Sequence, residues 1–397
     1  MTGKRLGMLE FTAMMAMLFA TIAFSIDAML PALPEIAREL TPLAENRAQL
    51  ILSAFVFGMG AGTLAAGPLS DSFGRKPVIA LGFALYLGGA VLAYLAPTLE
   101  LVLVARLIQG LGVAGPRIVG LALVRDLYAG REMARVTSFV MTVFMIVPAL
   151  APSIGALIIH TAGWRAVFLA FLLFGALAMT WVGLRQAETL PDERRRPLSA
   201  ASLWAAAREV LTSREVMTYA AVMTLGFGQM FALLSSAQQI FDVTYGRGAG
   251  FPLWFAAMAV LAGTAGPLNA RLVGKVGMRP MVARAYAAQA VSTLAVIGAL
   301  EMSGDKAGFV VFFLWATSVF FMAGITFGNL NALALQRMGH IAGMTASIVS
   351  AISTMLAVAI AAPVGLAFDG SPLPVMAGVL VCSTLAYLLM RTTRIFA

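Results

Sequence analysis

Two ionisable side chains, Asp27 and Arg106, stand inside long apolar stretches of the sequence. If both stretches are helical, Asp27 lies about 9 Å and Arg106 about 10 Å from the same end, so we expect the two at one depth. A charge at the centre of a membrane helix costs about 2.5 to 3.5 kcal/mol and must meet a partner, water or a ligand. A carboxyl whose surroundings alternate among these can take up and release a proton. The pair is therefore a candidate for proton coupling, and the alternative is a static ion pair that fixes packing.

Other polar side chains in apolar stretches are candidates for contacts with a substrate. Arg117 is eleven residues after Arg106, on nearly the same helical face and about 16 Å deeper, where it either lines a cavity or reaches the inner headgroups. Gln229 and Ser236 share one face of a second stretch. Asn329 and Asn331 lie about 200° apart, so at most one of them faces a cavity. The alternative for all of these is a hydrogen bond to a neighbouring helix.

The composition places these side chains in a membrane protein. Of 397 residues, 60% are hydrophobic and 11% charged, with mean hydropathy +0.91, against about 45 to 50% apolar residues in a soluble domain. Apolar stretches of about 20 residues, each long enough to cross a bilayer, recur along the chain. We predict an all-α integral membrane protein with about twelve transmembrane helices. Their predicted cores are 9–33, 49–69, 77–96, 99–124, 136–160, 163–186, 214–240, 251–272, 280–301, 308–336, 342–368 and 373–390.

The distribution of positive charge predicts the orientation of the chain. Only Arg38, Arg47, Arg165, Arg247 and Lys306 fall in the odd-numbered loops, whereas most of the 27 Lys and Arg residues fall in the even-numbered loops and at the termini. The positive-inside rule then places both termini in the cytoplasm. It also explains the net charge of +9 without a nucleic-acid partner. We expect a multi-pass membrane protein.

Several functional classes are disfavoured. Cys382 is the single cysteine, and His160 and His340 are expected on opposite sides of the membrane, so we predict no metal site. No phosphate-binding GxxxxGK[ST] motif is present. A membrane-embedded enzyme, the least favoured alternative, would need clustered acids, His or Cys at one depth. We expect no cofactor, and if the chain pumps, the proton-motive force must drive it.

A long polar connection divides the chain into halves. Residues 1–186 and 214–397 each hold six predicted helices, and 187–213 form a linker whose apolar spacing permits an amphipathic helix on the inner leaflet. GPLSDSFGRKP (67–77) has an echo in GPLNARLVGKVGMRP (266–280), and APSIG (151–155) in APVG (362–365). Such echoes indicate two pseudo-symmetric six-helix bundles, an arrangement typical of transporters.

The loop GPLSDSFGRKP resembles the signature loop between helices two and three of the major facilitator superfamily. RLIQG (106–110) and VPALAPSIGALI (147–158) resemble its fourth-helix arginine motif and the fifth-helix motif of drug antiporters. The segments LPALPEIARELT, ALVRDLYAGREMARV, GWRAVF and FGNLNALALQRMGHIAG are similar to the bicyclomycin-resistance (Bcr/CflA-like) branch of drug:proton antiporters. The resemblance covers nearly the whole chain, and with it we expect a multi-pass monomer in the bacterial inner membrane.

The resemblance implies a conformational latch at the cytoplasmic side. In it, the Asp71 carboxylate would meet a helix N-terminus and an arginine such as Arg125, while Arg75 and Lys76 hold the cytoplasmic face. The second copy of the loop has Asn269 and Ala270 in place of an acid, so we expect the latch on one side only. Alternatively, the loop charges only set the topology. The predicted latch residues are Gly67, Asp71, Gly74, Arg75, Lys76, Pro77 and Arg125.

The resemblance also implies a role for three residues of the fifth span. Pro148 and Pro152 each remove a backbone donor, and Gly155 allows a close approach to a neighbouring helix. The implied neighbour is the eleventh span, with the contact acting as a pivot or seal, and the alternative is ordinary close packing.

The function that follows is proton-coupled efflux of small amphipathic drugs or antibiotics by alternating access. An alternative with the same fold is import or export of a metabolite or nutrient. The family pattern places an acid at Asp27, where proton and drug would compete.

Overall fold

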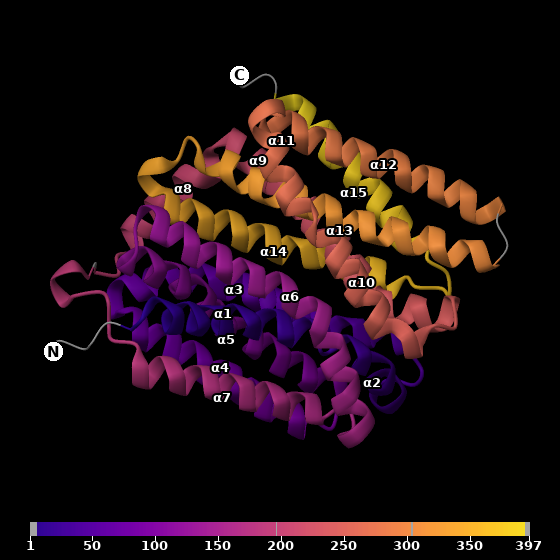
Figure 1. Ribbon diagram of the computed structural model, residues 1–397, viewed down its shortest axis with the longest axis horizontal. Helices are drawn as coiled ribbons and strands as arrows, with labels where there is room; N and C mark the ends of the chain where they lie inside the picture. Colours follow the sequence, from indigo (N-terminus) through magenta and orange to yellow (C-terminus); the bar gives the residue numbers. More distant parts are fainter. Residues whose placement is uncertain (1–5, 196, 303–304, 394–397) are drawn as a thin grey trace. The chain divides into compact units, whose positions relative to one another are not determined.

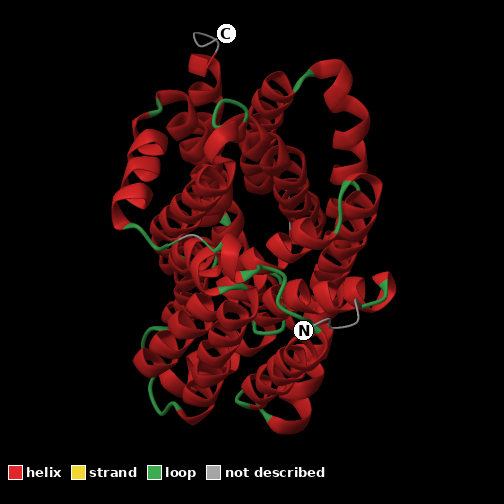
Figure 2. Ribbon diagram, turned by 90° about the vertical axis from the view of Figure 1, so that its left-hand side faces the viewer, coloured by secondary structure: helices red, strands yellow, loops and turns green. Residues whose placement is uncertain are grey.

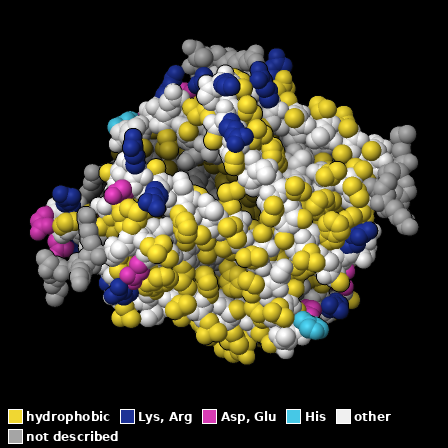
Figure 3. Space-filling model, viewed as in Figure 1, with side chains coloured by type: hydrophobic (Ala, Val, Ile, Leu, Met, Phe, Trp, Pro, Cys, Tyr) yellow, Lys and Arg dark blue, Asp and Glu magenta, His cyan; other side chains and the backbone are white. Residues whose placement is uncertain are grey.

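The computed structural model describes residues 6–195, 197–302 and 305–393, and the regular elements are helices (Figure 2). Twelve helical segments of the described chain are long and apolar enough to cross a membrane. This confirms the predicted fold class, and each segment overlaps one predicted core. Apolar side chains dominate the face shown in Figure 3, and charged side chains gather at its rim. Such a surface suits contact with lipid.

The helices follow one another along the chain (Figure 1). In order they are α1 (Met8–Asp27), α2 (Leu33–Leu40), α3 (Leu50–Phe73), α4 (Arg75–Leu95), α5 (Leu99–Leu127), α6 (Gly130–Ala162), α7 (Ala166–Arg185), α8 (Ala200–Thr212), α9 (Arg214–Gln239), α10 (Phe251–Gly263), α11 (Ala265–Val276), α12 (Met278–Met302), α13 (Asp305–Leu335), α14 (Ala342–Leu366) and α15 (Leu373–Thr392). Short 3₁₀ turns occupy Leu30–Ala32, Glu45–Gln49, Asp192–Arg194, Gly248–Gly250 and Gly339–Ile341, and a π turn follows α9 at Ile240–Thr244.

Proline explains two interruptions that hydropathy does not reveal. Pro31 has no N–H to donate to the carbonyl of Asp27 four residues earlier, and α1 ends at Asp27. By the same spacing, Pro267 cannot bond to Gly263, where α10 ends before α11 begins at Ala265. The first and eighth spans are therefore each built from two helices.

The repeated loop has the same backbone geometry in both copies. Gly74 separates α3 from α4 with φ of 101°, and Gly277 separates α11 from α12 with φ of 85°. Side chains other than hydrogen disfavour this conformation, so glycine is required at both turns. Pro77 and Pro280 each follow three residues later, in the first turn of the next helix, where proline is tolerated.

The chain divides into two compact units. Unit 1 holds the residues up to Pro42 and Ala54–Ala200, and unit 2 holds Leu43–Ser53 and the residues from Ala201 onward. The short segment Leu43–Ser53, which lies early in the sequence, therefore belongs to the later unit. The linker predicted at 187–213 contains the 3₁₀ turn Asp192–Arg194 and the helix α8.

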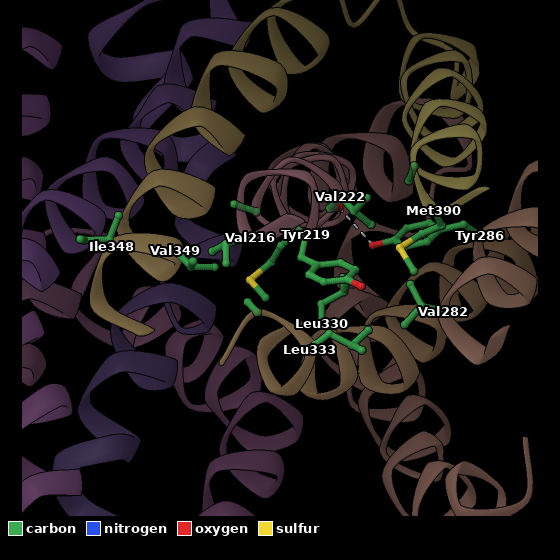
Figure 4. Packing of buried hydrophobic residues seen from close by; sticks show 14 of the residues in the cluster. Val216, Tyr219, Val222, Val282, Tyr286, Leu330, Leu333, Ile348, Val349 and Met390 are labelled. Carbon is green, nitrogen blue, oxygen red and sulfur yellow. Dashed lines mark hydrogen bonds between the residues drawn. The ribbon is translucent and has the colours of Figure 1, made fainter. Parts of the chain in front are cut away.

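Each unit has an apolar core. In unit 2, Tyr219 of α9, Val282 of α12, Leu330 of α13 and Met390 of α15 converge, as Figure 4 shows. The Tyr286 hydroxyl donates to the carbonyl of Val222 at 3.4 Å, which ties α12 to α9. In unit 1, the large fully buried aromatic side chains are Phe11, Phe55, Phe83, Tyr86, Phe168 and Phe171.

Candidate functional site

Asp27 is the last residue of α1 and is 5% exposed. The residues that precede it in the last turn, Ser25 and Ile26, are buried as well. Across the described part of the chain, no hydrogen bond or ion pair to its carboxyl is found. Because α1 ends at Asp27, four residues before Pro31, the carboxyl stands at a helix end inside the unit. This is the predicted position for an acid that exchanges a proton.

Arg106 of α5 is completely buried and contacts the backbone near Asp27, with no ion pair to that carboxyl among the described residues. Its Nη2 donates to the carbonyl of Ser25 at 2.8 Å, and its Nη1 donates to Oε1 of Gln109 at 3.0 Å. The guanidinium carbon lies 4.2 Å from the ring centroid of Phe55, which places the cation over an aromatic face. The predicted proximity of Arg106 to the Asp27 region is present, but the link runs through Ser25.

Tyr86 of α4 contacts the same residue, Ser25, and sequence reasoning missed it. Its hydroxyl lies 2.6 Å from the Ser25 Oγ, and both atoms are buried. Nothing in the local sequence around Tyr86 distinguishes this tyrosine from one that packs against lipid. Only the fold brings it to the end of α1.

The loop between α3 and α4 holds an ion-pair network centred on Arg75. The Arg75 Nη1 donates to Asp71 Oδ1 at 2.6 Å, and its Nε donates to Asp126 Oδ2 at 3.0 Å. The Ser70 hydroxyl accepts from the same Nη1 at 2.9 Å. Arg125, the predicted partner of Asp71, donates to the Leu121 carbonyl of its own helix. Its neighbour Asp126 is a second partner of Arg75 that was not predicted, and a latch contact made by Arg125 stays a prediction.

A third acid, Glu188, completes this region and was not predicted. Its two carboxylate oxygens accept from the backbone N–H groups of Arg75 and Lys76, both at 2.9 Å. In the first turn of a helix such N–H groups have no partner within the helix itself, so the carboxylate supplies one. Its negative charge also lies at the positive end of the helix dipole. Thr189, the next residue, donates from Oγ1 to Asp126 at 2.8 Å. The start of the interunit connection is thereby attached to the loop.

The remaining predicted residues of the loop support its backbone. The Lys76 ammonium donates to the carbonyl of Gly183 in α7 at 2.9 Å. The Gly67 carbonyl accepts from the Ser70 hydroxyl at 2.9 Å, within the last turns of α3. Together with Gly74 and Pro77, these contacts fix the turn between the two helices.

The fifth span is one continuous helix, α6, despite Pro148 and Pro152 inside it. Gly155 is buried, and a Cβ at this position would collide with the carbonyl oxygen of Ala28. The expectation named the eleventh span as the neighbour of this motif. For Gly155, the close neighbour within unit 1 is the residue that follows Asp27, and the contact with the eleventh span stays a prediction.

The predicted substrate residues mostly bond to other helices. Gln229 accepts from the Ser383 hydroxyl at 2.7 Å, and Asn329 donates to Asn269 at 2.8 Å. Asn331 is exposed, which agrees with the prediction that the two asparagines face different directions. Gln229 and Asn329 therefore follow the alternative interpretation, in which a polar side chain bonds to a neighbouring helix.

Arg117 is half-buried, and its Nη1 lies 3.7 Å from the Met59 sulfur. A cation beside a polarizable thioether can accept an anionic or aromatic ligand. Arg117 therefore stays a candidate for substrate contact.

The segment Leu43–Ser53 is joined to the rest of unit 2 by amides. Gln49 accepts from the Ser236 hydroxyl at 3.0 Å and donates to Gln239 at 2.6 Å. Asn46 donates to the Leu366 and Phe368 carbonyls at 3.1 and 2.8 Å. Ser236, a predicted substrate residue, is thus engaged by a residue that lies far from it in the sequence.

Unit 2 has its own ion-pair network near the second copy of the loop. The loop lacks an acid, as Asn269 and Ala270 predicted, but Glu215 in the first turn of α9 supplies one. It accepts a hydrogen bond from Arg279 at 2.5 Å and forms an ion pair with Arg337, whose Nε lies 3.1 Å from Oε2. The Tyr219 hydroxyl, which Figure 4 shows beside the apolar core, also donates to Glu215 at 3.2 Å. An expectation based on the loop alone could not identify this acid, which lies on another helix.

Metal-binding side chains do not gather in the part of the chain that the structure describes, where no group of three or more His, Cys, Asp or Glu side chains could hold an ion. The acids Asp71, Asp126, Glu188 and Glu215 pair with arginines, hydroxyls or backbone N–H groups instead.

Comparison with known proteins agrees with this architecture. The profile of the Major Facilitator Superfamily matches residues 13–393. The chain is 32% identical over 340 residues to a bicyclomycin resistance protein homolog of Haemophilus influenzae, covering 83% of this chain and 82% of the relative. It is 27% identical over 373 residues to the uncharacterised MFS-type transporter YdgK of Bacillus subtilis, covering 92% and 90%.

Among solved structures, the D-xylose-proton symporter matches with a TM-score of 0.75 at 16% identity, covering 96% of this chain and 97% of that one. A likeness at this identity concerns the fold alone. With the profile match and the Haemophilus relative, the chain belongs to the Major Facilitator Superfamily, among transporters similar to the bicyclomycin-resistance proteins, and is a multi-pass membrane transporter of the bacterial inner membrane.

Proposed function

We propose that the chain exports small amphipathic drugs or antibiotics in exchange for protons. The observation that carries the proposal is the buried carboxyl of Asp27 at the end of α1. An ionisable group inside a membrane span is costly and is retained where it binds an ion or a substrate. Similarity to a bicyclomycin resistance protein homolog supports a drug as the substrate.

The proposed cycle is alternating access with both termini in the cytoplasm. A proton and a drug compete for the region of Asp27, which opens in turn to the two sides of the membrane. The network of Asp71, Arg75 and Asp126 then lies at the cytoplasmic ends of α3, α4 and α5, where it keeps these helix ends together. In this proposal the loop stiffens unit 1 so that it moves as a body.

One carboxyl is sufficient for useful export. A proton that crosses about 150 mV releases about 3.5 kcal/mol, at about 2.3 kcal/mol per 100 mV. Each tenfold gradient of a neutral drug requires about 1.4 kcal/mol. One proton per drug therefore supports a gradient of about 300-fold.

The test is transport into liposomes that contain the purified chain, under an imposed pH gradient, with wild type and Asp27→Asn at equal protein content. We expect the variant to lose uphill transport and drug-induced proton release, because the amide cannot carry the proton. A matched control is Asp369→Asn, in the loop between α14 and α15. Hydrogen bonds from the hydroxyl and the backbone N–H of Ser371 lower the pKa of Asp369, so this acid stays ionised throughout the assay.

Uphill transport of a neutral drug by Asp27→Asn at the wild-type rate, still abolished by a protonophore, would remove Asp27 from proton coupling. A metabolite transporter with this fold is the competing function. It would be recognised when no compound in a drug panel is exported by wild type while a metabolite panel gives proton-dependent flux.

A further inference from the structure

The chain on the N-terminal side of Asp27 is bound by two other helices at one residue. Ser25 has a single hydroxyl hydrogen, which it donates to the Thr21 carbonyl at 2.6 Å. The short contact between Ser25 Oγ and the Tyr86 hydroxyl, also 2.6 Å, must therefore use the hydrogen of Tyr86. The Ser25 carbonyl accepts from Arg106 at 2.8 Å. Two residues before Asp27, α5 thus holds the backbone of Ser25 and α4 holds its side chain.

The chain on the other side of Asp27 is bound by a third helix. Gly155 of α6 lies so close to Ala28 that a Cβ would collide with the Ala28 carbonyl oxygen and lie 3.0 Å from its Cα. The collision is with backbone, which cannot rotate away as the end of a flexible side chain can. Glycine at 155 therefore allows α6 to press directly on the residue after Asp27.

Arg106 is suited to holding the Ser25 backbone because its own guanidinium is held on several sides. Besides its bonds to Ser25 and Gln109, it lies 4.2 Å from the Phe55 ring centroid and 5.7 Å from that of Phe171. Such a cation is fixed in place and serves as a rigid donor to the Ser25 carbonyl.

We propose that Tyr86 and Gly155 are positioning residues that hold Asp27 from both sides, through Ser25 and Ala28. This rests on the proposed function, in which Asp27 carries the proton. A group that exchanges a proton and competes with a ligand must keep its position within about 0.5 Å, and that precision comes from neighbours that are themselves packed and bonded. Pro31 ends α1 at Asp27. Without the contacts of Tyr86 and Gly155, this helix end would therefore be free to fray.

The proposal is tested by the rate at which dicyclohexylcarbodiimide, an apolar reagent that modifies protonated carboxyls in membranes, labels Asp27 in reconstituted protein. Labelling is measured by mass spectrometry, and Asp27→Asn identifies the peptide. Loss of one hydrogen bond, about 1 kcal/mol net, raises the population of displaced conformers about fivefold. We therefore expect Tyr86→Phe to accelerate labelling of Asp27 about fivefold. Gly155→Ala should accelerate it at least as much, because its Cβ would collide with the Ala28 carbonyl oxygen and displace the segment.

Two matched controls separate positioning from general loosening. Tyr286→Phe also removes a fully buried hydroxyl, which bonds to Val222 in unit 2. Gly88→Ala adds a methyl group to α4 where nothing lies within 4 Å. Both should label Asp27 at the wild-type rate. Labelling of the buried Glu215 reports on unfolding, and it should not change in any of the four variants.

A double-mutant cycle identifies the route through Ser25. Ser25→Ala removes the acceptor of the Tyr86 bond, so Ser25→Ala combined with Tyr86→Phe should label at the rate of either single variant. The proposal is overturned if Tyr86→Phe and Gly155→Ala both label at the wild-type rate, or if labelling of Glu215 rises in parallel with that of Asp27.

Transport by the same proteoliposomes keeps this proposal separate from the proposed function. Proton release per drug exported should fall in Tyr86→Phe and stay at the wild-type value in Tyr286→Phe. If wild type exports no drug, the proposed function fails, whereas the labelling rates still decide whether Asp27 is held through Ser25 and Ala28.

Discussion

Removing the charge of Asp126 should destabilise unit 1 more than removing that of Asp71, although only Asp71 belongs to the recognised loop motif. Both acids bind Arg75, whose side chain is 9% exposed. The Asp126 side chain is 23% exposed and that of Asp71 is 52% exposed. Asp126 also accepts from Thr189, so it joins α4, α5 and the segment after α7.

The expected difference follows from these environments. A hydrogen bond to a charged group contributes about 1.5 to 3 kcal/mol when sheltered, and partial exposure of Asp126 brings this to about 1.5 to 2 kcal/mol. An exposed ion pair such as that of Asp71 contributes about 0.2 to 1 kcal/mol. For a body of about 190 residues, 1 kcal/mol corresponds to about 2 to 4 °C in Tm. We expect Asp126→Asn to lower Tm by about 3 to 8 °C and Asp71→Asn by less than about 4 °C.

The assay is thermal unfolding of purified variants in one detergent, at one protein concentration and scan rate. Asp192→Asn is the control. The Asp192 side chain, which forms an ion pair with Arg195, is 80% exposed, so this substitution should shift Tm by less than about 1 °C. Raising the salt concentration should reduce the effect of Asp71→Asn more than that of Asp126→Asn, since sheltered pairs are screened less. Equal shifts, or a larger shift for Asp71→Asn, would refute the assignment of Asp126 as the main partner of Arg75.

Three further outcomes are expected from other parts of the chain. Gly74→Ala should lower Tm more than Gly277→Ala, because both glycines have positive φ but a Cβ at Gly74 would also lie 2.8 Å from a Glu188 carboxylate oxygen; equal shifts in thermal unfolding would contradict this. Glu215→Gln should lower the stability of unit 2 by about 2 kcal/mol, since two arginines lose their counter-ion; an unchanged urea midpoint would exclude a structural role for this network. Arg117→Ala should reduce export of anionic compounds several-fold more than export of neutral ones, and a uniform reduction across a compound panel would show that Arg117 does not select substrates.

The sequence contains enough information to predict the spans and the turn at the repeated loop. Hydropathy registers whether about 20 residues can cross a bilayer, and Gly74 with Pro77 specifies a local backbone conformation. The identity of polar partners is different, because it depends on which helices pack together. Asp126 and Arg125 are neighbours in sequence, and only the rotation of α5 decides which of them faces Arg75.

The candidate site shows the same limit. Asp27 is conspicuous because a charge in an apolar span is rare. Tyr86 is inconspicuous, since a tyrosine in a span is ordinary, and its contact with Ser25 joins residues 61 positions apart. The place of Leu43–Ser53 in unit 2 is equally hard to predict from the sequence. It depends on side-chain amides that bond to α9 and to the chain at the end of α14.

The attachment of Glu188 to the first turn of α4 also determines how much of the connection between α7 and α8 is anchored to unit 1. Residues 188–190 are fixed to the loop through this carboxylate, and Ala200–Thr212 is helical, with Val210 buried in the core of unit 2. About nine residues, 191–199, lie between these two anchored parts, with a maximal reach of about 30 Å. Glu188→Gln weakens the attachment and so lengthens the part of the connection that is not anchored to unit 1. A single carboxylate next to the signature loop thus determines where the unanchored part of the connection begins.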